Sequence, residues 1–362
     1  MELKIEHQPA AHCENGAIST LLRFHGIHLS EPMIFGLASG LYFTHIPFIK
    51  MGGQPVTAFR TFPGVLFKRI MRLLGIKSKS KRFLKPESAM KALDRVLFDE
   101  GKPVGCVVGM YYLPYMPIEY RFHFNGHNIC VIGKDEETDE YIVLDTNAIE
   151  RATISKKDLM RARFAKGGTY PVYGQMYWID RLPEVEVDLS PLIMKSIAKT
   201  CWHMLSQPGF VKVVGVNAIF NLSKRIRLWE RKTGRRKAIL HLAQVVRMLE
   251  EIGTGGAGFR FVFGAFLQEA ADATDLQEFD EFSRRITVIG DLWREFAYNA
   301  ARIIKKRNDS EYTFNMLGDL LEKIATSEKE FFQDLRAFVK TAKPKRSTPL
   351  YVGHNTPQQA PD

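Results

Sequence analysis

The segment FNGHNICVIG (residues 124–133) and the segment YIVLDTN (residues 141–147) determine the fold around them. Both are apolar and β-prone, and the polar turn at 134–140 separates them, so the pattern predicts a β-hairpin. If the turn is centred near residue 136, positions whose numbers add up to about 272 face each other, as His127 and Asp145 do. Directly opposed residues have Cβ atoms roughly 4.5–5.5 Å apart. We therefore expect a carboxylate that holds an imidazole in one tautomer.

A cysteine lies at the start of a predicted helix near the N-terminus. In AAHCENGAISTLLRFHG (residues 10–26), apolar residues recur at helical spacing over 14–24, and Gly26 ends the helix. Cys13 then lies at the helix N-terminus, where free N–H groups and the helix dipole favour a thiolate. In such places, next to a histidine, thiol pKa values fall from about 8.5 to roughly 3.5–7.5. Cys13, His127 and Asp145 are thus the candidate nucleophile, base and orienting group.

Each of these residues also has a structural interpretation. A cysteine near a helix start is commonly a small buried apolar residue. A single histidine is commonly a hydrogen-bonded structural residue, and an aspartate at a strand end commonly belongs to a turn. A zinc site built from His12, His123 and His127 is a further alternative, but no carboxylate or thiolate ligand stands at suitable spacing. We predict no metal and no cofactor.

The composition is that of a globular protein. The chain is 45% hydrophobic and 25% charged, which predicts two domains with real cores rather than a disordered chain. The first residues, MELKIEHQPAAHC, lack the pattern of a signal peptide, so we expect a cytoplasmic protein. The four cysteines have no CxxC spacing, which favours reduced thiols over a disulfide scaffold.

The net charge of +11 is concentrated in clusters. Over 65–76, basic and apolar residues alternate in a helix-like pattern, typical of an amphipathic segment that meets an anionic surface. We expect Lys68, Arg69 and Arg72 to bind a partner. An acidic carrier protein and peripheral contact with an anionic membrane are the leading candidates; without a recognisable nucleic-acid motif we expect no nucleic acid. A merely solvated basic face is the commonest explanation of such a cluster.

The apolar stretch at 33–49 contains several glycines and is short for a membrane span. It predicts a buried helix, capped by Ser30, that leads into a glycine-rich loop. Gly36 and Gly40 let the backbone approach another group closely, so we expect them to bind substrate. A tight turn packed on the core is the structural alternative.

The sequence pattern changes near residue 185, which predicts an α+β fold with two domains. Residues 1–185 mix helices with strands, whereas 186–342 carry helical periodicity almost throughout. Residues 343–362 are expected to form a flexible tail. Within the helical half, four glycines at 253–258 precede an apolar helix, but the Lys-Ser or Lys-Thr pair of a phosphate loop is absent. A tight interhelical turn is therefore favoured there over an anion site next to Arg260.

Several segments together resemble a known family. These are HCENGAISTLLRFHGIHLSEPMIFGLASGLYF (12–43), YYLPY (111–115), GHNICVIGKD (126–135) and YIVLD (141–145). They are similar to the N-terminal domain of the butirosin-biosynthesis protein H family. The segment GGAGFRFVFGAFLQEAA (255–271) resembles the helical domain that commonly follows it.

The resemblance implies a papain-like or C39-peptidase-like core in which Cys13, His127 and Asp145 match the triad. It implies an acyltransferase that moves an acyl or aminoacyl group from a carrier-protein thioester to an amine on a small molecule or lipid. Gln8 resembles the oxyanion-hole glutamine of papain-like enzymes, although its spacing from the cysteine is one residue short. Tyr112 of the YYLPY motif is expected to contact substrate.

One departure concerns the acceptor. Family members often carry an acidic residue shortly before the tyrosine-leucine-proline motif, whereas this chain has Gly109 and Met110 there. If that position holds a cationic acceptor, the acceptor of this protein differs.

Two other functions compete with acyl transfer. A cysteine peptidase or amidase would use water as the acceptor, so hydrolysis would outrun transfer to added amines. A non-catalytic adaptor for a carrier protein or membrane surface would keep its activity after Cys13→Ala.

Overall fold

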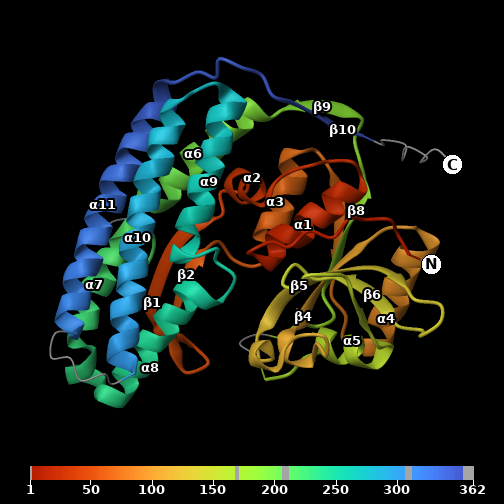
Figure 1. Cartoon of the computed structure of the whole chain (residues 1–362), viewed down its shortest axis with the longest axis horizontal. Coiled ribbons are helices and arrows are strands. Elements are labelled where there is room, and N and C mark those ends of the chain that lie inside the picture. The colour runs from red at the N-terminus through yellow and green to blue at the C-terminus, as the bar shows by residue number, and fades with distance from the viewer. Residues whose placement is uncertain (1, 168–170, 206–211, 306–311, 354–362) are drawn as a thin grey trace. The chain divides into compact units, whose positions relative to one another are not determined.

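The computed structural model describes residues 2–167, 171–205, 212–305 and 312–353. The chain forms two compact units (Figure 1). The first contains residues 1–34, 63–187 and 349–362, and the second contains residues 35–62 and 188–348, insofar as they are described. The α+β fold class, with strands in the N-terminal part and helices in the C-terminal part, is confirmed.

The first unit is built on a six-stranded antiparallel sheet with the strand order β3-β8-β4-β5-β6-β7. The predicted hairpin forms its β5 and β6. The strands are β3 (Lys77–Lys81), β4 (Val104–Gly109), β5 (Asn125–Lys134), β6 (Tyr141–Leu144), β7 (Ala152–Ile154) and β8 (Met176–Arg181). A separate small sheet pairs β9 (Val185–Asp188) with β10 (Pro349–Val352).

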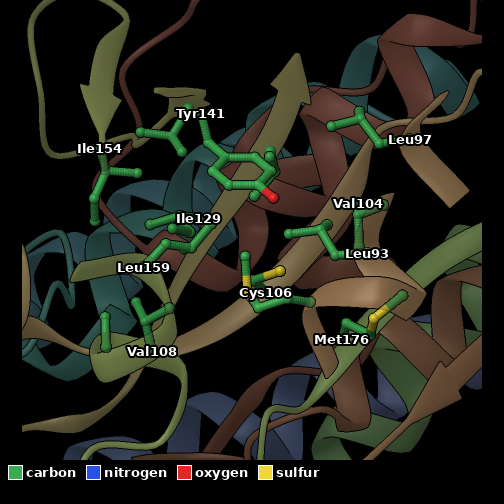
Figure 2. Packing of buried hydrophobic residues seen from close by; sticks show 14 of the residues in the cluster. Leu93, Leu97, Val104, Cys106, Val108, Ile129, Tyr141, Ile154, Leu159 and Met176 are labelled. Carbon is green, nitrogen blue, oxygen red and sulfur yellow. The ribbon is translucent and has the colours of Figure 1, made fainter. Parts of the chain in front are cut away.

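Helices of the first unit cover both faces of this sheet. They are α1 (Cys13–Phe24), α3 (Val65–Leu73), α4 (Pro86–Asp94), the π-helix η1 (Arg95–Asp99), the 3-10 turns η2 (Met110–Tyr112) and η3 (Ile118–Tyr120), and α5 (Lys156–Arg163). Because successive strand residues point to opposite faces, β5 serves two layers. Ile129 and Val131 join the apolar cluster with Leu93 and Leu159 (Figure 2). On the other side, the Cys130 thiol donates to a carbonyl of α1.

The second unit is a helical bundle that holds a β-hairpin. The hairpin consists of β1 (Leu41–Met51) and β2 (Gln54–Arg60). The helices are α6 (Leu189–Leu205), α7 (Gly215–Thr233), α8 (Arg235–Val246), η4 (Arg247–Glu251), η5 (Ala257–Phe259), α9 (Arg260–Thr274), α10 (Glu278–Ile304) and α11 (Phe314–Thr341). The hairpin contacts α6, α7 and α8, and its Phe59 ring packs on Trp293 of α10. The short helix α2 (Glu31–Leu37) spans the boundary between the units.

Three expectations from the sequence need correction. The glycine-rich loop expected after α2 is the strand β1, because this segment pairs with β2 and packs on α6 and α7. Residues 35–62, expected in the N-terminal domain, therefore pack in the second unit. The expected tail is ordered as far as β10, which pairs with β9, and residues 354–362 lie outside the described part of the chain. The chain passes from the first unit to the second after Val187.

Candidate active site

The helix α1 holds Cys13 in its first turn. His12 caps the helix, and its ring accepts a hydrogen bond from the Asn15 N–H. The Glu31 carboxylate accepts from the backbone N–H groups of Ala11 and His12, at 2.9 and 2.7 Å, and so fixes the chain just before the cysteine. The Cys13 side chain is buried, with 9% of its surface exposed. The helix start predicted from the sequence is confirmed.

His127 of β5 lies between Asp145 and Cys13. Its Nε2 is 2.7 Å from Asp145 Oδ2, and the ring also makes a hydrogen bond with the Cys13 side chain. With Nε2 on the carboxylate, Nδ1 remains for the sulfur. All three side chains are buried. The structure thus brings together the three residues singled out as nucleophile, base and orienting group.

The expected register of the hairpin is wrong although the contact exists. Cys130 pairs with Leu144. A bulge at Ile132 then shifts the pairing by one residue, so that Lys134 stands opposite Tyr141. Continued in this register, Asp145 stands opposite Ile129, so its contact with His127 is diagonal. The turn is centred one to two residues later than assumed, because the Asp135 N–H closes it on the Glu140 carbonyl.

Asp145 is held by two donors besides His127. The Tyr115 hydroxyl donates to its Oδ2 at 3.0 Å, and the backbone N–H of Asn147 donates to its Oδ1 at 3.0 Å. Burial and the neighbouring carboxylate raise the pKa of Tyr115, so the phenol keeps its proton. The YYLPY motif therefore contributes Tyr115 to the site, a role that the sequence analysis did not assign.

The charges of this group reinforce one another. Burial by itself lowers the pKa of His127, but the charges and hydrogen bonds of Asp145 and Cys13 outweigh burial and raise it overall. Burial by itself raises the pKa of Asp145, but the imidazolium and the donated hydrogen bonds lower it below its usual value. The arrangement therefore favours an imidazolium at neutral pH, and an imidazolium favours a thiolate on the sulfur beside it.

Asn128 is a further polar group at the cysteine that the sequence analysis missed. Its Nδ2 lies 3.8 Å from Cys13 Sγ and 3.1 Å from the Gly126 carbonyl. Its Oδ1 accepts from the Tyr177 hydroxyl of β8 at 2.8 Å. Asn128 and Tyr177 are both 4% exposed. The only signal in the sequence is the adjacency of Asn128 to His127.

The closeness of α1 to Asp145 depends on a glycine. A Cβ on Gly16 would lie 2.1 Å from Cγ2 of Thr146, the residue after Asp145. The Ala10 N–H also donates to the Thr146 carbonyl. Only glycine at this position lets the helix that carries the cysteine approach the segment that carries the aspartate.

Gln8 does not lie where an oxyanion donor is needed. Its side chain is exposed, and its Oε1 accepts from the guanidinium of Arg23 in the last turn of α1. Arg23 is ten residues after Cys13, or about 15 Å along a helix. The assignment of Gln8 to the oxyanion hole is therefore wrong, because the extended N-terminal segment runs along α1 instead of curling over its start.

The predicted substrate-binding glycines pack on phenylalanine rings. A Cβ on Gly36 would lie 2.1 Å from the ring of Phe266 of α9, and one on Gly40 would lie 2.5 Å from the ring of Phe35. The close approach expected at these glycines is real, but side chains of the helical unit occupy the space. The prediction that they bind substrate is wrong here.

Tyr112 is half-buried at the rim of the apolar cluster in the first unit. The Arg161 guanidinium lies over its ring, 5.5 Å from the centroid. Its role in binding substrate stays a prediction.

The basic residues of α3 divide between two environments. Leu66, Phe67, Ile70 and Met71 are buried, whereas Lys68 and Arg72 are exposed one helical turn apart, and Arg69 is half-buried. The edge strand β3 adds the exposed Lys77, Lys79 and Lys81, of which Lys79 pairs with Asp180 at 2.6 Å. Lys79 and Lys81 stand opposite Trp178 and Met176 of the apolar cluster, whereas α3 packs on Tyr177 from the other face, so these lysines lie on the face of the sheet that α3 does not cover. The exposed cations of α3 are therefore Lys68 and Arg72, here called the α3 basic pair.

The described residues also bear on metal binding and on membrane insertion. No group of three or more histidine, cysteine, aspartate or glutamate residues in this part of the chain is arranged to hold a metal. His123, one of the residues of the alternative zinc site, stacks on the ring of Tyr111 at 4.2 Å. None of the described helices combines the length and the apolar composition that crossing a membrane requires.

The chain matches two family models. Residues 12–146 match the model described as butirosin biosynthesis protein H, N-terminal. Residues 157–335 match a domain of unknown function (DUF4872), which begins within α5 and covers most of the helical unit. No curated protein matches the chain. The first description is that of a biosynthetic protein, which agrees with an enzyme. The chain therefore combines an N-terminal domain of the butirosin biosynthesis protein H family with a C-terminal DUF4872 domain.

Proposed function

We propose that this protein is a cysteine-dependent acyltransferase that moves an acyl or aminoacyl group from a thioester to an amine through an acyl-Cys13 intermediate. The observation that carries the proposal is the position of His127, whose Nε2 lies 2.7 Å from Asp145 Oδ2 and whose ring also makes a hydrogen bond with the Cys13 side chain. This is the arrangement that activates a cysteine nucleophile. The family match adds a biosynthetic setting.

In the first half-reaction, the Cys13 thiolate attacks the thioester carbonyl carbon. A new C–S bond forms, and the carbonyl π electrons move to the oxygen. When the carbonyl re-forms, the bond to the donor sulfur breaks, and the departing thiolate takes the proton from the His127 imidazolium. Asp145 keeps the ring oriented and stabilises its positive form.

In the second half-reaction, neutral His127 accepts the proton of the attacking amine. The amine nitrogen bonds to the acyl carbon, and the Cys13 thiolate leaves. The product is an amide, and the thiolate-imidazolium pair is restored. With water in place of the amine, the same steps would release a carboxylic acid.

The α3 basic pair supports an acidic donor. Two exposed cationic side chains one helical turn apart favour association with a negatively charged partner. We propose an acyl carrier protein, or a carrier of similar charge, as the donor. The acceptor is an amine-bearing small molecule or lipid, and lipid would add peripheral membrane contact.

The decisive experiment incubates the protein with a panel of acyl thioesters, both carrier-bound and small, and measures acylation of Cys13 by intact and peptide mass spectrometry. We expect an adduct of the acyl mass on Cys13, its absence in Cys13→Ala, and much slower formation in His127→Ala. A panel of amines added to the acylated protein then separates transfer from hydrolysis. Release of free acid at a rate that no amine changes would favour the peptidase or amidase function. No adduct from any donor would favour the adaptor.

A further inference from the structure

The site needs a donor for the negative charge that develops on the acyl oxygen. When the thiolate attacks a carbonyl, the oxygen becomes an oxyanion, and removal of one donor to it costs about 10²–10³-fold in rate in other acyl-transfer enzymes. The glutamine that the sequence suggested for this task, Gln8, is bonded to Arg23 and exposed. Another buried group at Cys13 has the required chemistry.

We propose that the side-chain amide of Asn128 is the oxyanion donor and that Tyr177 positions it. This inference rests on the proposed acyl transfer through Cys13. Asn128 Nδ2 lies 3.8 Å from Cys13 Sγ, so it reaches an oxygen on the carbon bonded to that sulfur. The donor comes from the strand that carries the histidine, instead of from the segment before the cysteine.

The surrounding contacts fix which end of the amide faces the sulfur. The Gly126 carbonyl, 3.1 Å from Nδ2, can only accept a hydrogen bond, and the Tyr177 hydroxyl donates to Oδ1 at 2.8 Å. One Nδ2 proton is therefore used by Gly126, and the other points to Cys13. Reversing the amide would place two acceptors, the carbonyl of Gly126 and the amide oxygen, against each other.

The sheet is built so that Tyr177 can reach Asn128. The strand β4 separates β8, which carries Tyr177, from β5, which carries Asn128. Gly105 of β4 stands opposite Tyr177, and a Cβ there would lie 2.4 Å from the tyrosine ring. The missing side chain lets the ring cross β4, and Phe67 of α3 packs against the ring at 4.6 Å. The tyrosine is thus held where its hydroxyl orients the amide.

In the proposed step, the Cys13 thiolate forms the C–S bond as the carbonyl π electrons move to oxygen. The Nδ2 proton that faced the sulfur now hydrogen-bonds to the oxyanion. When the C=O bond re-forms, the donor thiolate leaves and takes its proton from His127. Asn128 returns to the sulfur and is neither protonated nor deprotonated in the cycle.

The test compares two reactions of the same sulfur in the full-length protein. In alkylation by iodoacetamide, the Cys13 thiolate attacks a CH₂ carbon and no oxyanion forms. In acylation by an acyl thioester or by p-nitrophenyl acetate, the thiolate attacks a carbonyl carbon and an oxyanion forms. We expect Asn128→Ala and Asn128→Ser to lower the acylation rate by about 10²–10³-fold and to change alkylation only a few-fold. Tyr177→Phe should lower acylation by about 3–10-fold, as loss of one orienting hydrogen bond does.

The matched control for Tyr177→Phe is Tyr141→Phe. Tyr141 is a buried tyrosine of the same sheet whose hydroxyl donates to Asp94 at 2.6 Å, on the side of the apolar cluster. Its substitution should leave both rates unchanged. Equal loss of alkylation and acylation in the Asn128 variants would overturn the proposal and make Asn128 a residue that supports the thiolate or the fold. Unchanged acylation would overturn it as well.

The two acyl donors separate this inference from the proposed function. If p-nitrophenyl acetate acylates the wild-type protein but no thioester does, the proposed thioester function is contradicted. The reaction with the ester would still test the role of Asn128. Wild-type protein that neither reagent acylates would contradict both.

Discussion

At the scale of single residues, the site depends on a buried charge arrangement. Cys13, His127 and Asp145 are all shielded from solvent, and Tyr115 and Asn147 supply the remaining hydrogen bonds to the carboxylate. A buried carboxylate with three donors stays ionised, and that charge acts on the histidine. The pairing of the two strands that carry His127 and lead to Asp145 was predictable, because both strands are evident in the sequence, whereas the register that makes their contact diagonal was not.

The first prediction concerns pH. In Asp145→Ala, the larger of the two contributions that raise the pKa of His127 is lost while burial still lowers it, so the pKa falls and less of the ring is protonated at pH 6. Alkylation of Cys13 by iodoacetamide at pH 6 should fall at least about tenfold and then rise with pH toward about 8.5, as for an ordinary thiol. The wild type should keep its reactivity below pH 7. Asp145→Asn, which keeps a hydrogen bond without the charge, should lie between them, and an unchanged rate at pH 6 would contradict the argument.

At the scale of elements, the packing of α1 on the sheet decides whether the three residues meet. Helix α1 contacts β4 and β5 and passes so close to Thr146 that Gly16 has no room for a side chain. Its N-terminus is fixed by Glu31. Local periodicity predicts the helix itself. Its closest contact with the segment after β6 joins Gly16 to Thr146, 130 positions later in the chain, and no local sequence pattern indicates it.

The second prediction tests this approach. Gly16→Ala places a methyl group 2.1 Å from Thr146 Cγ2, so the helix must shift. We expect a loss of about 1–3 kcal/mol in the free energy of unfolding, typical of overpacking, together with slower acylation of Cys13. Thr146→Ser removes the methyl group that the new alanine side chain at position 16 would contact. The double variant should therefore recover part of the lost stability in denaturant titrations and part of the lost acylation rate. A double variant no better than Gly16→Ala would show that another contact, such as that of Ala10, limits the site.

The third prediction concerns α3. Lys68→Glu with Arg72→Glu reverses both charges of the α3 basic pair without touching the buried face of the helix. We expect a higher KM for an acidic carrier-bound donor, no change for a small thioester, and a smaller effect at high salt because exposed charges are screened. Lys156→Glu with Lys157→Glu, at the exposed start of α5, makes the same charge change elsewhere and should have little effect. Equal effects of the two pairs would remove the case for a specific surface.

At the scale of the whole molecule, the chain is divided between a sheet unit and a helical unit, and the division does not follow the sequence simply. The hairpin of β1 and β2 belongs with the helices that begin at residue 188, and β10 returns to β9. The glycine-rich segment at 253–258 is a tight turn before α9, as favoured from the sequence. Arg260, beside it, is completely enclosed and faces the Glu328 carboxylate.

The fourth prediction concerns this ion pair in the helical unit. Arg260 makes two hydrogen bonds to Glu328, at 2.9 and 3.0 Å, and a third to the Gly258 carbonyl, while Trp293 donates to the same carboxylate. Arg260→Met should lower the free energy of unfolding by about 3–5 kcal/mol, because it leaves a buried carboxylate without its cation. Glu328→Gln added to this variant removes the uncompensated charge and should recover part of the loss in chemical denaturation. No recovery would mean that Arg260→Met destabilises the protein through lost packing and not through the uncompensated charge of Glu328.

The sequence by itself determined the elements with a clear local period: α1, the hairpin strands β5 and β6, and the helical character of residues 186–342. It also indicated Cys13, His127 and Asp145, because a helix start and a hairpin each place a side chain by local geometry. Only the tertiary structure decided that Gln8 lies away from the cysteine, that Gly36 and Gly40 pack on phenylalanine rings, and that Asn128 and Tyr177 meet at Cys13. These outcomes depend on which distant segments become neighbours, and the energy of such contacts has no counterpart in the local pattern of residues.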